Sequence, residues 1–271
     1  AFRAPSGRLW LAYGVLNRMN RTCIHLRYSD DDGRNWLPLE LGKVGRVPGS
    51  LWPADGRLPG DDFGTYTKAD PDPRIVALGD GLACLWHNRR VKSGQHVDLH
   101  MVRYDGQRWL TPEIVPYTSE KTQLHSLPRL HAIGLGGKEI FVLTAYANGV
   151  LHYRDGQWTR QLPEAPASVS RLCLAGEKTV VVIAAIPQPG GTTRGTARLT
   201  APVVFRMWQR GPDGRWSQPR DVAREDEPIP LDETWAGFQV PRFSPPNFVP
   251  IIWANGSDWV KVVRVPVVQS P

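Results

Sequence analysis

The stretch IHLRYSDDDGRNW, residues 24–36, decides the fold class of this chain. Residues 24–28 form an apolar and aromatic segment that fits a β-strand. The pattern Ser29-x-Asp31-x-Gly33-x-x-Trp36 follows at once, so that a tight polar turn leads into a tryptophan that opens the next strand. The stretch therefore predicts a strand, a turn and a second strand in close succession.

The same theme recurs along the whole chain. Each copy has an Arg-containing start, two strands joined by a loop, a glycine turn and a tryptophan that opens a further strand. The last copy ends after its third strand. The five copies cover residues 2–36, 73–109, 128–158, 170–216 and 241–265.

A four-stranded antiparallel unit repeated every fifty-odd residues cannot bury its own faces, and it must stack on its neighbours. The chain holds 26 Gly and 25 Pro among 271 residues, too many for a helical bundle. We therefore expect an all-β protein. The predicted architecture is a single β-propeller domain over residues 1–271, with five visible four-stranded blades, or six if the chain is truncated at its N-terminus.

The turn at residues 29–36 resembles the Asp-box of the sialidase superfamily at every defining position. The other turns are degenerate copies: residues 105–109 keep Gly and Trp, and residues 155–158 and 213–216 are one residue shorter. The chain as a whole resembles bacterial sialidase-like, BNR-repeat propellers. In that family the Asp-box is structural and lies away from the active site, so the resemblance implies packing roles for Trp36, Trp109, Trp158 and Trp216.

The charge balance indicates an anionic partner. The net charge is +7, and 26 of the 33 basic residues are Arg, whose planar fork binds carboxylate or phosphate bidentately. A GC-rich coding bias is the alternative source of this excess. The chain contains none of the standard nucleic-acid recognition modules, no phosphate-binding glycine loop and no zinc spacing. We therefore expect no nucleic acid, no cofactor and no metal.

Other sequence features concern the compartment. The longest apolar run, residues 180–186, is too short to span a membrane as a helix. Cys23, Cys84 and Cys173 lie far apart in apolar segments, which favours buried free thiols over a disulfide framework. We expect a secreted or periplasmic protein. The oligomeric state is left open.

In the predicted propeller, the segments that lead into the first strands share one face with the loops between second and third strands. The Asp-box turns lie on the other face. Sialidases bind the carboxylate of sialic acid with three arginines, and the resemblance offers Arg74, Arg129 and Arg242 for this role. The alternative is that these arginines form ion pairs between blades. The full set expected on the binding face is Arg74, Arg89, Arg129, Arg171 and Arg242.

Two mechanisms of glycan cleavage remain open at this stage. A sialidase needs a carboxylic acid/base, for which Asp62 and Asp70 in the longest insertion are candidates, with Glu225 among further carboxylates on that face. A uronate lyase uses His or Tyr to remove a proton, a role that His87, His125 and Tyr66 could fill. The alternative for the acidic residues of the insertion is a solvated loop, and the alternative for the histidines is a structural role with hydrogen bonds.

The sequence thus favours a carbohydrate-active propeller that recognises an anionic glycan carrying sialic acid or uronate. Sialidase-like hydrolysis comes first, and a polysaccharide lyase or a non-catalytic binding propeller are the alternatives.

Overall fold

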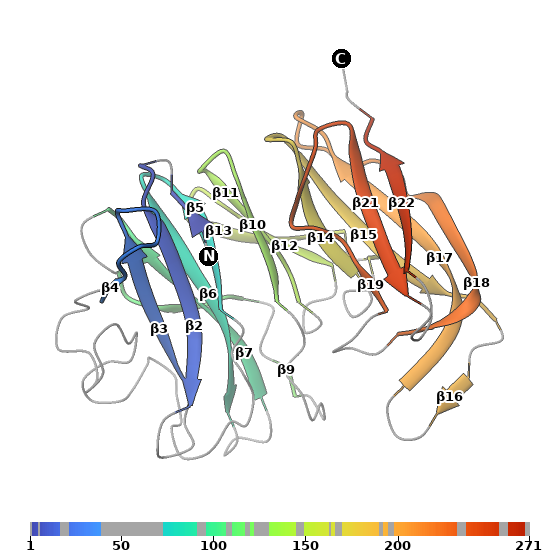
Figure 1. Cartoon of the computed structure of the whole chain (residues 1–271), viewed down its shortest axis with the longest axis horizontal. Coiled ribbons are helices and arrows are strands. Elements are labelled where there is room, and N and C mark those ends of the chain that lie inside the picture. The colour runs from blue at the N-terminus through green and yellow to red at the C-terminus, as the bar shows by residue number, and fades with distance from the viewer. Residues whose placement is uncertain are drawn as a thin grey trace. The chain divides into compact units, whose positions relative to one another are not determined.

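The computed structural model (Figure 1) is built from β-strands and short turns, and no helix occurs in the ranges that it describes. The prediction of an all-β protein is confirmed for that part of the chain. Two compact units are present: Ala1–Ile140 with Arg154–Trp158, and Phe141–Tyr153 with Thr159–Pro271. The described residues are 2–4, 6–16, 22–38, 73–90, 96–106, 110–116, 120–121, 130–144, 149–162, 164–165, 170–189, 192–194, 198–231, 237–254 and 260–268.

The first three sheets follow the chain order that the repeat predicts. Sheet 1 runs β1 (Phe2–Arg3), β2 (Leu9–Leu16), β3 (Thr22–Ser29), β4 (Leu37–Pro38). Sheet 2 runs β5 (Arg74–Leu78), β6 (Gly81–Arg90), β7 (His96–Tyr104), β8 (Glu113–Ile114), and β9 (Glu120–Lys121) also pairs with β7. Sheet 3 runs β10 (His131–Leu135), β11 (Glu139–Leu143), β12 (Val150–Arg154), β13 (Gln157–Gln161).

The last two sheets depart from the simple repeat. Sheet 4 runs β16 (Thr192–Arg194), β17 (Arg198–Arg210), β15 (Thr179–Pro187), β14 (Ser170–Ala175), β20 (Phe243–Ser244), and β18 (Arg220–Pro230) also pairs with β17. Sheet 5 runs β19 (Phe238–Gln239), β21 (Phe248–Ala254), β22 (Val260–Pro266). Four-stranded antiparallel units thus recur in sheets 1 to 3. Their arrangement as the blades of one propeller domain stays a prediction.

The fifth copy begins earlier than the sequence indicates. Its first strand is β19, where Phe238 pairs with Trp253. Arg242 follows that strand, and the adjoining β20 pairs in parallel with β14 of sheet 4. Placing Arg242 at the start of the fifth first strand was wrong, because the Pro-Arg pattern of the other copies recurs here partway along the segment.

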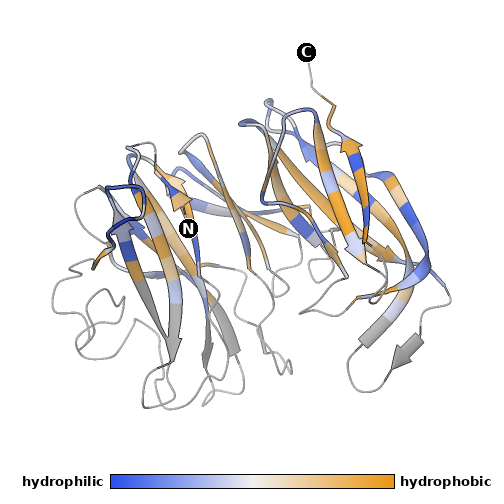
Figure 2. Ribbon diagram, in the orientation of Figure 1, coloured by the Kyte–Doolittle hydropathy of each residue, from blue (hydrophilic) through white to orange (hydrophobic). Residues whose placement is uncertain are grey.

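The sheets pack face to face through apolar side chains. In the first unit, Trp10 and Leu26 of sheet 1 meet Ile75, Cys84 and Trp86 of sheet 2. In the second unit, one core joins the inner faces of sheets 4 and 5. The hydrophobic colouring of Figure 2 follows the strands, and the hydrophilic colouring gathers at the turns. Two free thiols, Cys84 and Cys173, are fully buried as expected, while the side chain of Cys23 lies outside the described residues.

Burial of both faces distinguishes the middle sheets from the last one. Every residue of β14 is buried, whereas buried and half-buried residues alternate along β21. On β22, Val260 and Val262 are 64% and 57% exposed. Alternation of this kind marks a sheet with one covered face. Among the described residues, sheet 5 therefore has a neighbour on one side.

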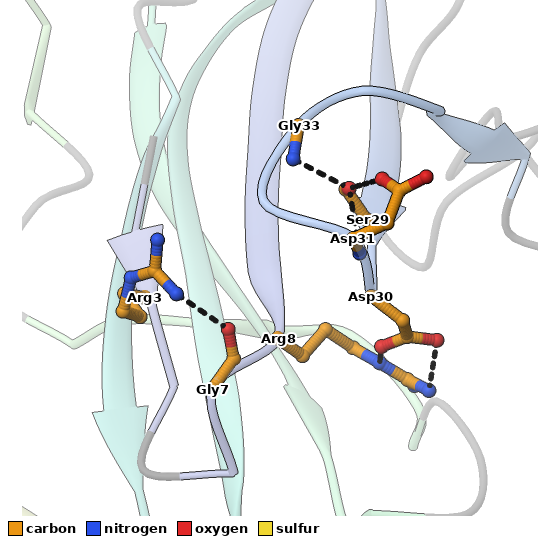
Figure 3. Close-up of polar contacts among 7 residues, drawn as sticks. All are labelled: Arg3, Gly7, Arg8, Ser29, Asp30, Asp31 and Gly33. Atoms are coloured by element: carbon orange, nitrogen blue, oxygen red, sulfur yellow. Dashed lines mark hydrogen bonds and ion pairs between the residues drawn. The ribbon is translucent and has the colours of Figure 1, made fainter.

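The Asp-box closes the turn between β3 and β4 through its side chains (Figure 3). The Ser29 hydroxyl donates to Asp31 at 2.7 Å and accepts the backbone N–H of Gly33 at 2.8 Å. Asp31 in turn accepts the backbone N–H of Asn35 at 2.8 Å, and these hydrogen bonds lower the pKa of its carboxyl. The turn needs glycine at position 33, where φ is 86°.

Arginines fasten the same end of sheet 1. Arg8 forms a bidentate pair with Asp30, at 2.6 and 2.9 Å, and its guanidinium lies 4.3 Å from the ring centre of Tyr28. Arg3 donates to the carbonyl of Gly7 at 3.1 Å, as Figure 3 shows. The polar turn is thus joined to the first strands of its own sheet.

The first strands of sheets 2 and 3 approach each other closely at Gly134. A Cβ atom at that position would lie 2.8 Å from the carbonyl oxygen of Ala77. Nearby, the backbone N–H of Gly79 donates to the carbonyl of Gly137 at 2.5 Å. Convergence of first strands within the first unit is what radial stacking requires.

Replacing Ser29 with Ala tests the Asp-box. Ser29 is 1% exposed, and the variant loses the acceptor for Gly33 and the donor to Asp31. We expect the free energy of unfolding to fall by about 1–2 kcal/mol in urea denaturation. The matched control is Ser6→Ala, at an exposed turn position. Equal stability of the two variants would show that the box is dispensable.

Replacing Gly134 with Ala tests the approach of the two first strands. The added methyl group forces the backbone of Ala77 to move, and we expect a loss of about 1–3 kcal/mol of stability. Urea denaturation measures this loss. A variant as stable as the parent protein would contradict the close approach of β5 and β10.

Candidate functional site

Each sheet of the first unit has two distinct ends. At the turn end lie the turns that join first to second and third to fourth strands. At the opposite end, here called the strand-start end, the first strand begins and the second strand finishes. Of the predicted residues, Arg74 and His87 lie toward this second end in the first unit.

Arg74 and His87 lie on one face of sheet 2 toward its strand-start end. Arg74 is the first residue of β5 and pairs with Leu85, while His87 on β6 pairs with Leu99. Because side chains two apart on a strand share a face, Leu85 and His87 point the same way as Arg74. The structure thus brings two of the predicted residues together.

The guanidinium of Arg74 reaches the neighbouring sheet. Its Nε donates to the carbonyl of Leu130 at 2.8 Å, directly before β10 begins. Nη1 donates to the carbonyl of Pro73 at 3.4 Å. Arg74 is half-buried and joins sheets 2 and 3, so it has a structural role whether or not a ligand binds there.

His87 is neutral in the folded protein. It is 2% exposed, and burial, together with the charge of Arg74 and the nearby His100, lowers its pKa to about 3. On the other face of the sheet, His100 stacks on Trp86 with ring centres 5.5 Å apart. A base with so low a pKa takes few protons at neutral pH. The environment of His87 is that of a buried structural histidine, and its predicted role as a base gains no support.

In sheet 4, Arg171 takes a position equivalent to that of Arg74 in sheet 2. Arg74 and Arg171 each lie the same number of residues before a turn glycine of positive φ, 59° at Gly79 and 60° at Gly176. Arg171 is 2% exposed, and its guanidinium lies 4.9 Å from the ring centre of Phe238 at the start of β19. Both arginines thus contact a neighbouring sheet, Arg74 through a backbone carbonyl and Arg171 through an aromatic ring, while the alternative of ion pairs between blades stays a prediction.

The equivalent residue of sheet 3 is His131. It precedes Gly136, whose φ is 57°, by the same interval. The Pro-Arg pattern had assigned this position to Arg129, which lies two residues earlier. The spacing to the turn glycine decides the equivalence, and this signal is present in the sequence.

Several predicted residues cannot be placed. The structure does not describe Asp62, Tyr66, Asp70, His125 and Arg129, nor the side chain of Arg89. Their proposed contacts with a ligand stay predictions, as do those of Arg171 and Arg242. Arg242 packs on Phe243 with its guanidinium 5.2 Å from the ring centre, beside the turn end of β14.

Glu225 has a structural environment. It is 3% exposed and accepts hydrogen bonds from Trp253 Nε1 at 2.8 Å and Lys261 Nζ at 2.6 Å. Burial raises the pKa of the carboxyl, but the hydrogen bonds of Lys261, Trp253 and the Glu227 backbone outweigh it, and the pKa lies below its ordinary value. A carboxylate held ionised in this way joins β18 to sheet 5 and does not serve as a proton donor.

The predicted packing tryptophans have different surroundings. Trp216 donates from Nε1 to Gln161 and meets the ring of Phe141 edge-on, which confirms its packing role. Trp158 is half-buried, and Trp36 covers Gly33 while remaining 37% exposed. Trp109 lies outside the described residues.

Charge is unevenly distributed over the sheets of the first unit. The carboxylates at the turn end are Asp30, Asp31, Asp32, Asp80, Asp105, Glu139 and Asp155. Among side chains that the structure describes in this unit, the further carboxylate is Glu113 on the outer strand β8. Arg74, His87 and His131 occupy the strand-start end. At the turn end Arg3, Arg8 and Arg154 pair with Asp32, Asp30 and Glu139, whereas at the strand-start end Arg74 contributes positive charge beside the neutral His87.

Within the described ranges, no group of three or more His, Cys, Asp or Glu side chains could hold a metal ion. The same ranges contain no helix long and apolar enough to cross a membrane.

Comparison with known proteins gives structural similarities at low sequence identity. No protein family matches the chain, and no curated protein matches it. One similar solved structure is a mutant of Aleuria aurantia lectin in complex with alpha-methyl-L-fucoside, with 13% identity over 97% of this chain and 80% of that chain, and a TM-score of 0.38. Another is a Mycobacterium tuberculosis puromycin-hydrolyzing peptidase, with 14% identity over 96% of this chain and 42% of that chain, and a TM-score of 0.33. TM-scores this low support no conclusion about fold or function.

His87 makes stability depend on pH. In the unfolded chain a histidine takes up its proton near pH 6.5, whereas in the folded protein the pKa is about 3. Between these values the unfolded state binds more protons, so stability falls as the pH falls from about 6.5 to 3. We expect His87→Gln to flatten this dependence, which reaches about 1.4 kcal/mol per pH unit for one group.

Urea denaturation at a series of pH values measures the slope for both proteins. The slope of the variant should be smaller between pH 6 and 4. Identical slopes would mean that His87 takes up its proton equally well in both states.

Proposed function

We propose that this protein is a glycan-binding β-propeller that recognises an acidic sugar, sialic acid or uronate, at the strand-start end of its sheets. The observation that carries the proposal is that the described carboxylates of the first unit lie on β8 or in the turns, where Arg3, Arg8 and Arg154 pair with several of them, while Arg74 lies at the opposite end. A surface with one sign of charge attracts ligands of the other sign.

The repeated sheets support the architecture of the proposal. Sheets 1, 2 and 3 each join consecutive antiparallel strands, the Asp-box closes the expected turn, and the first strands converge at Gly134. Stacked sheets of this kind present loops of successive units on one face, where binding residues concentrate.

Binding takes precedence over cleavage in this proposal. His87 has a low pKa and Glu225 is fully engaged, so neither gives the described part of the chain an acid or base for catalysis. Hydrolysis would depend on Asp62 or Asp70, and elimination on Tyr66 or His125. Both reactions are outcomes of the experiment below.

The experiment offers the purified protein sialylated, uronate-containing and neutral glycans on one array. We expect retention of the acidic glycans. Arg129→Ala should weaken their binding about tenfold or more, since a charged hydrogen bond contributes roughly 1.5–3 kcal/mol. The matched control is Arg206→Ala, which removes an exposed arginine paired with Asp221 on an outer strand.

Three results would contradict the proposal: equal binding of neutral and acidic glycans, preference for a neutral sugar, or equal effects of the two substitutions. New reducing ends during incubation would add hydrolysis to the binding role. Ultraviolet absorbance of unsaturated uronates would add a lyase activity.

A further inference from the structure

A hydrogen-bond relay in the second unit fixes the protonation state of a buried histidine. Trp216 Nε1 donates to Gln161 Oε1 at 2.7 Å, and Gln161 Nε2 lies 2.9 Å from His152 Nδ1. The three residues come from the turn after β17, from β13 and from β12. His152 is 6% exposed.

The chemistry of the donors sets the direction of every bond. An indole nitrogen can only donate, so the Gln161 amide must turn its oxygen toward Trp216. The amide then presents its NH₂ group, again a donor, to His152. Nδ1 of His152 must therefore accept, which leaves the imidazole neutral with its proton on Nε2.

Aromatic stacking holds the same imidazole in place. His152 stacks on Phe141 with ring centres 4.5 Å apart and an angle of 11° between the planes. Trp216 meets Phe141 edge-on at 6.4 Å, and the Arg210 guanidinium lies 5.0 Å from the centre of the Phe141 ring. A proton on His152 would thus place a second cation beside that of Arg210.

Charged groups on the surrounding elements have contacts outside the relay or are exposed. Glu139 at the start of β11 pairs with Arg154 at the end of β12, and Arg160 on β13 is exposed. In the turn itself, Asp213 accepts the backbone N–H of Arg215 at 3.0 Å.

From these contacts we infer that the relay Trp216–Gln161–His152 is an acid-sensitive latch that holds the turn of residues 212–216 against sheet 3. A proton on Nδ1 would point at the Gln161 NH₂ group. Rotation of the amide would relieve that clash only by turning NH₂ toward the Trp216 N–H. Either way one hydrogen bond is lost, and acid releases the turn.

The inference is independent of the proposed glycan binding, and nuclear magnetic resonance tests it on the whole chain. The indole N–H signal of Trp216 is assigned as the signal that is missing from the spectrum of the Trp216→Phe variant. Correlations to the ring nitrogens of His152, assigned with His152→Asn, report its tautomer. At pH 8 we expect the proton on Nε2, and on acidification the Trp216 signal should shift together with the ring signals of His152.

Gln161→Glu reverses the chemistry of the relay. A carboxylate accepts from Trp216 and also from a protonated Nδ1, so it favours the charged imidazole. We expect the pH at which His152 titrates to rise by about one unit or more in this variant. Gln161→Leu is the control, in which the Trp216 signal should no longer follow His152.

Several results would overturn the inference. A proton on Nδ1 at pH 8 would show that the relay runs in another way. If the Trp216 signal stays fixed while His152 titrates, the two residues are not coupled, and the latch is contradicted. If neither signal moves before the protein unfolds, or if Gln161→Glu titrates as the parent protein does, acid does not act through this relay.

Discussion

A β-sheet cannot bury an apolar face by itself, so each apolar face in this protein needs a neighbouring sheet. The inner strands depend on neighbouring sheets for their burial, as the fully buried residues of β14 show, whereas the outer strand β13 is largely exposed. Sheet 5, with exposed Val260 and Val262, shows the result when one face has no neighbour among the described residues. Stacking of successive sheets is thus the constraint from which the other features follow.

Two arginines at the starts of first strands add contacts between sheets to this apolar packing. Arg74 donates a hydrogen bond to the carbonyl of Leu130, which precedes β10. Arg171 packs on the ring of Phe238, the first residue of β19 in sheet 5. A planar guanidinium suits both contacts because its edge donates hydrogen bonds while its face stacks on rings. The same residues bring positive charge to the strand-start end, so structural and ligand-binding roles can coincide there.

Buried ionisable groups are matched to their surroundings in different ways. His87 and His152 are held neutral. Burial beside Arg74 does this for His87, and for His152 the hydrogen bonds are compatible with one tautomer, the one protonated on Nε2. Glu225 is instead held ionised by Lys261 and Trp253. For His152 and Glu225 the burial of a polar group is offset by specific partners, which is the usual condition for keeping it in a core.

The sequence by itself determined the all-β class, the repeated sheets and the Asp-box, because turn chemistry and strand composition act over a few neighbouring residues. It also placed Arg74 and Arg171 at the starts of their strands. Only the tertiary structure decided that Arg242 lies beside the turn end of β14. It likewise revealed the partners of Glu225 and of Trp216. These properties depend on strand register and on contacts between residues far apart in the chain, and local patterns do not encode either.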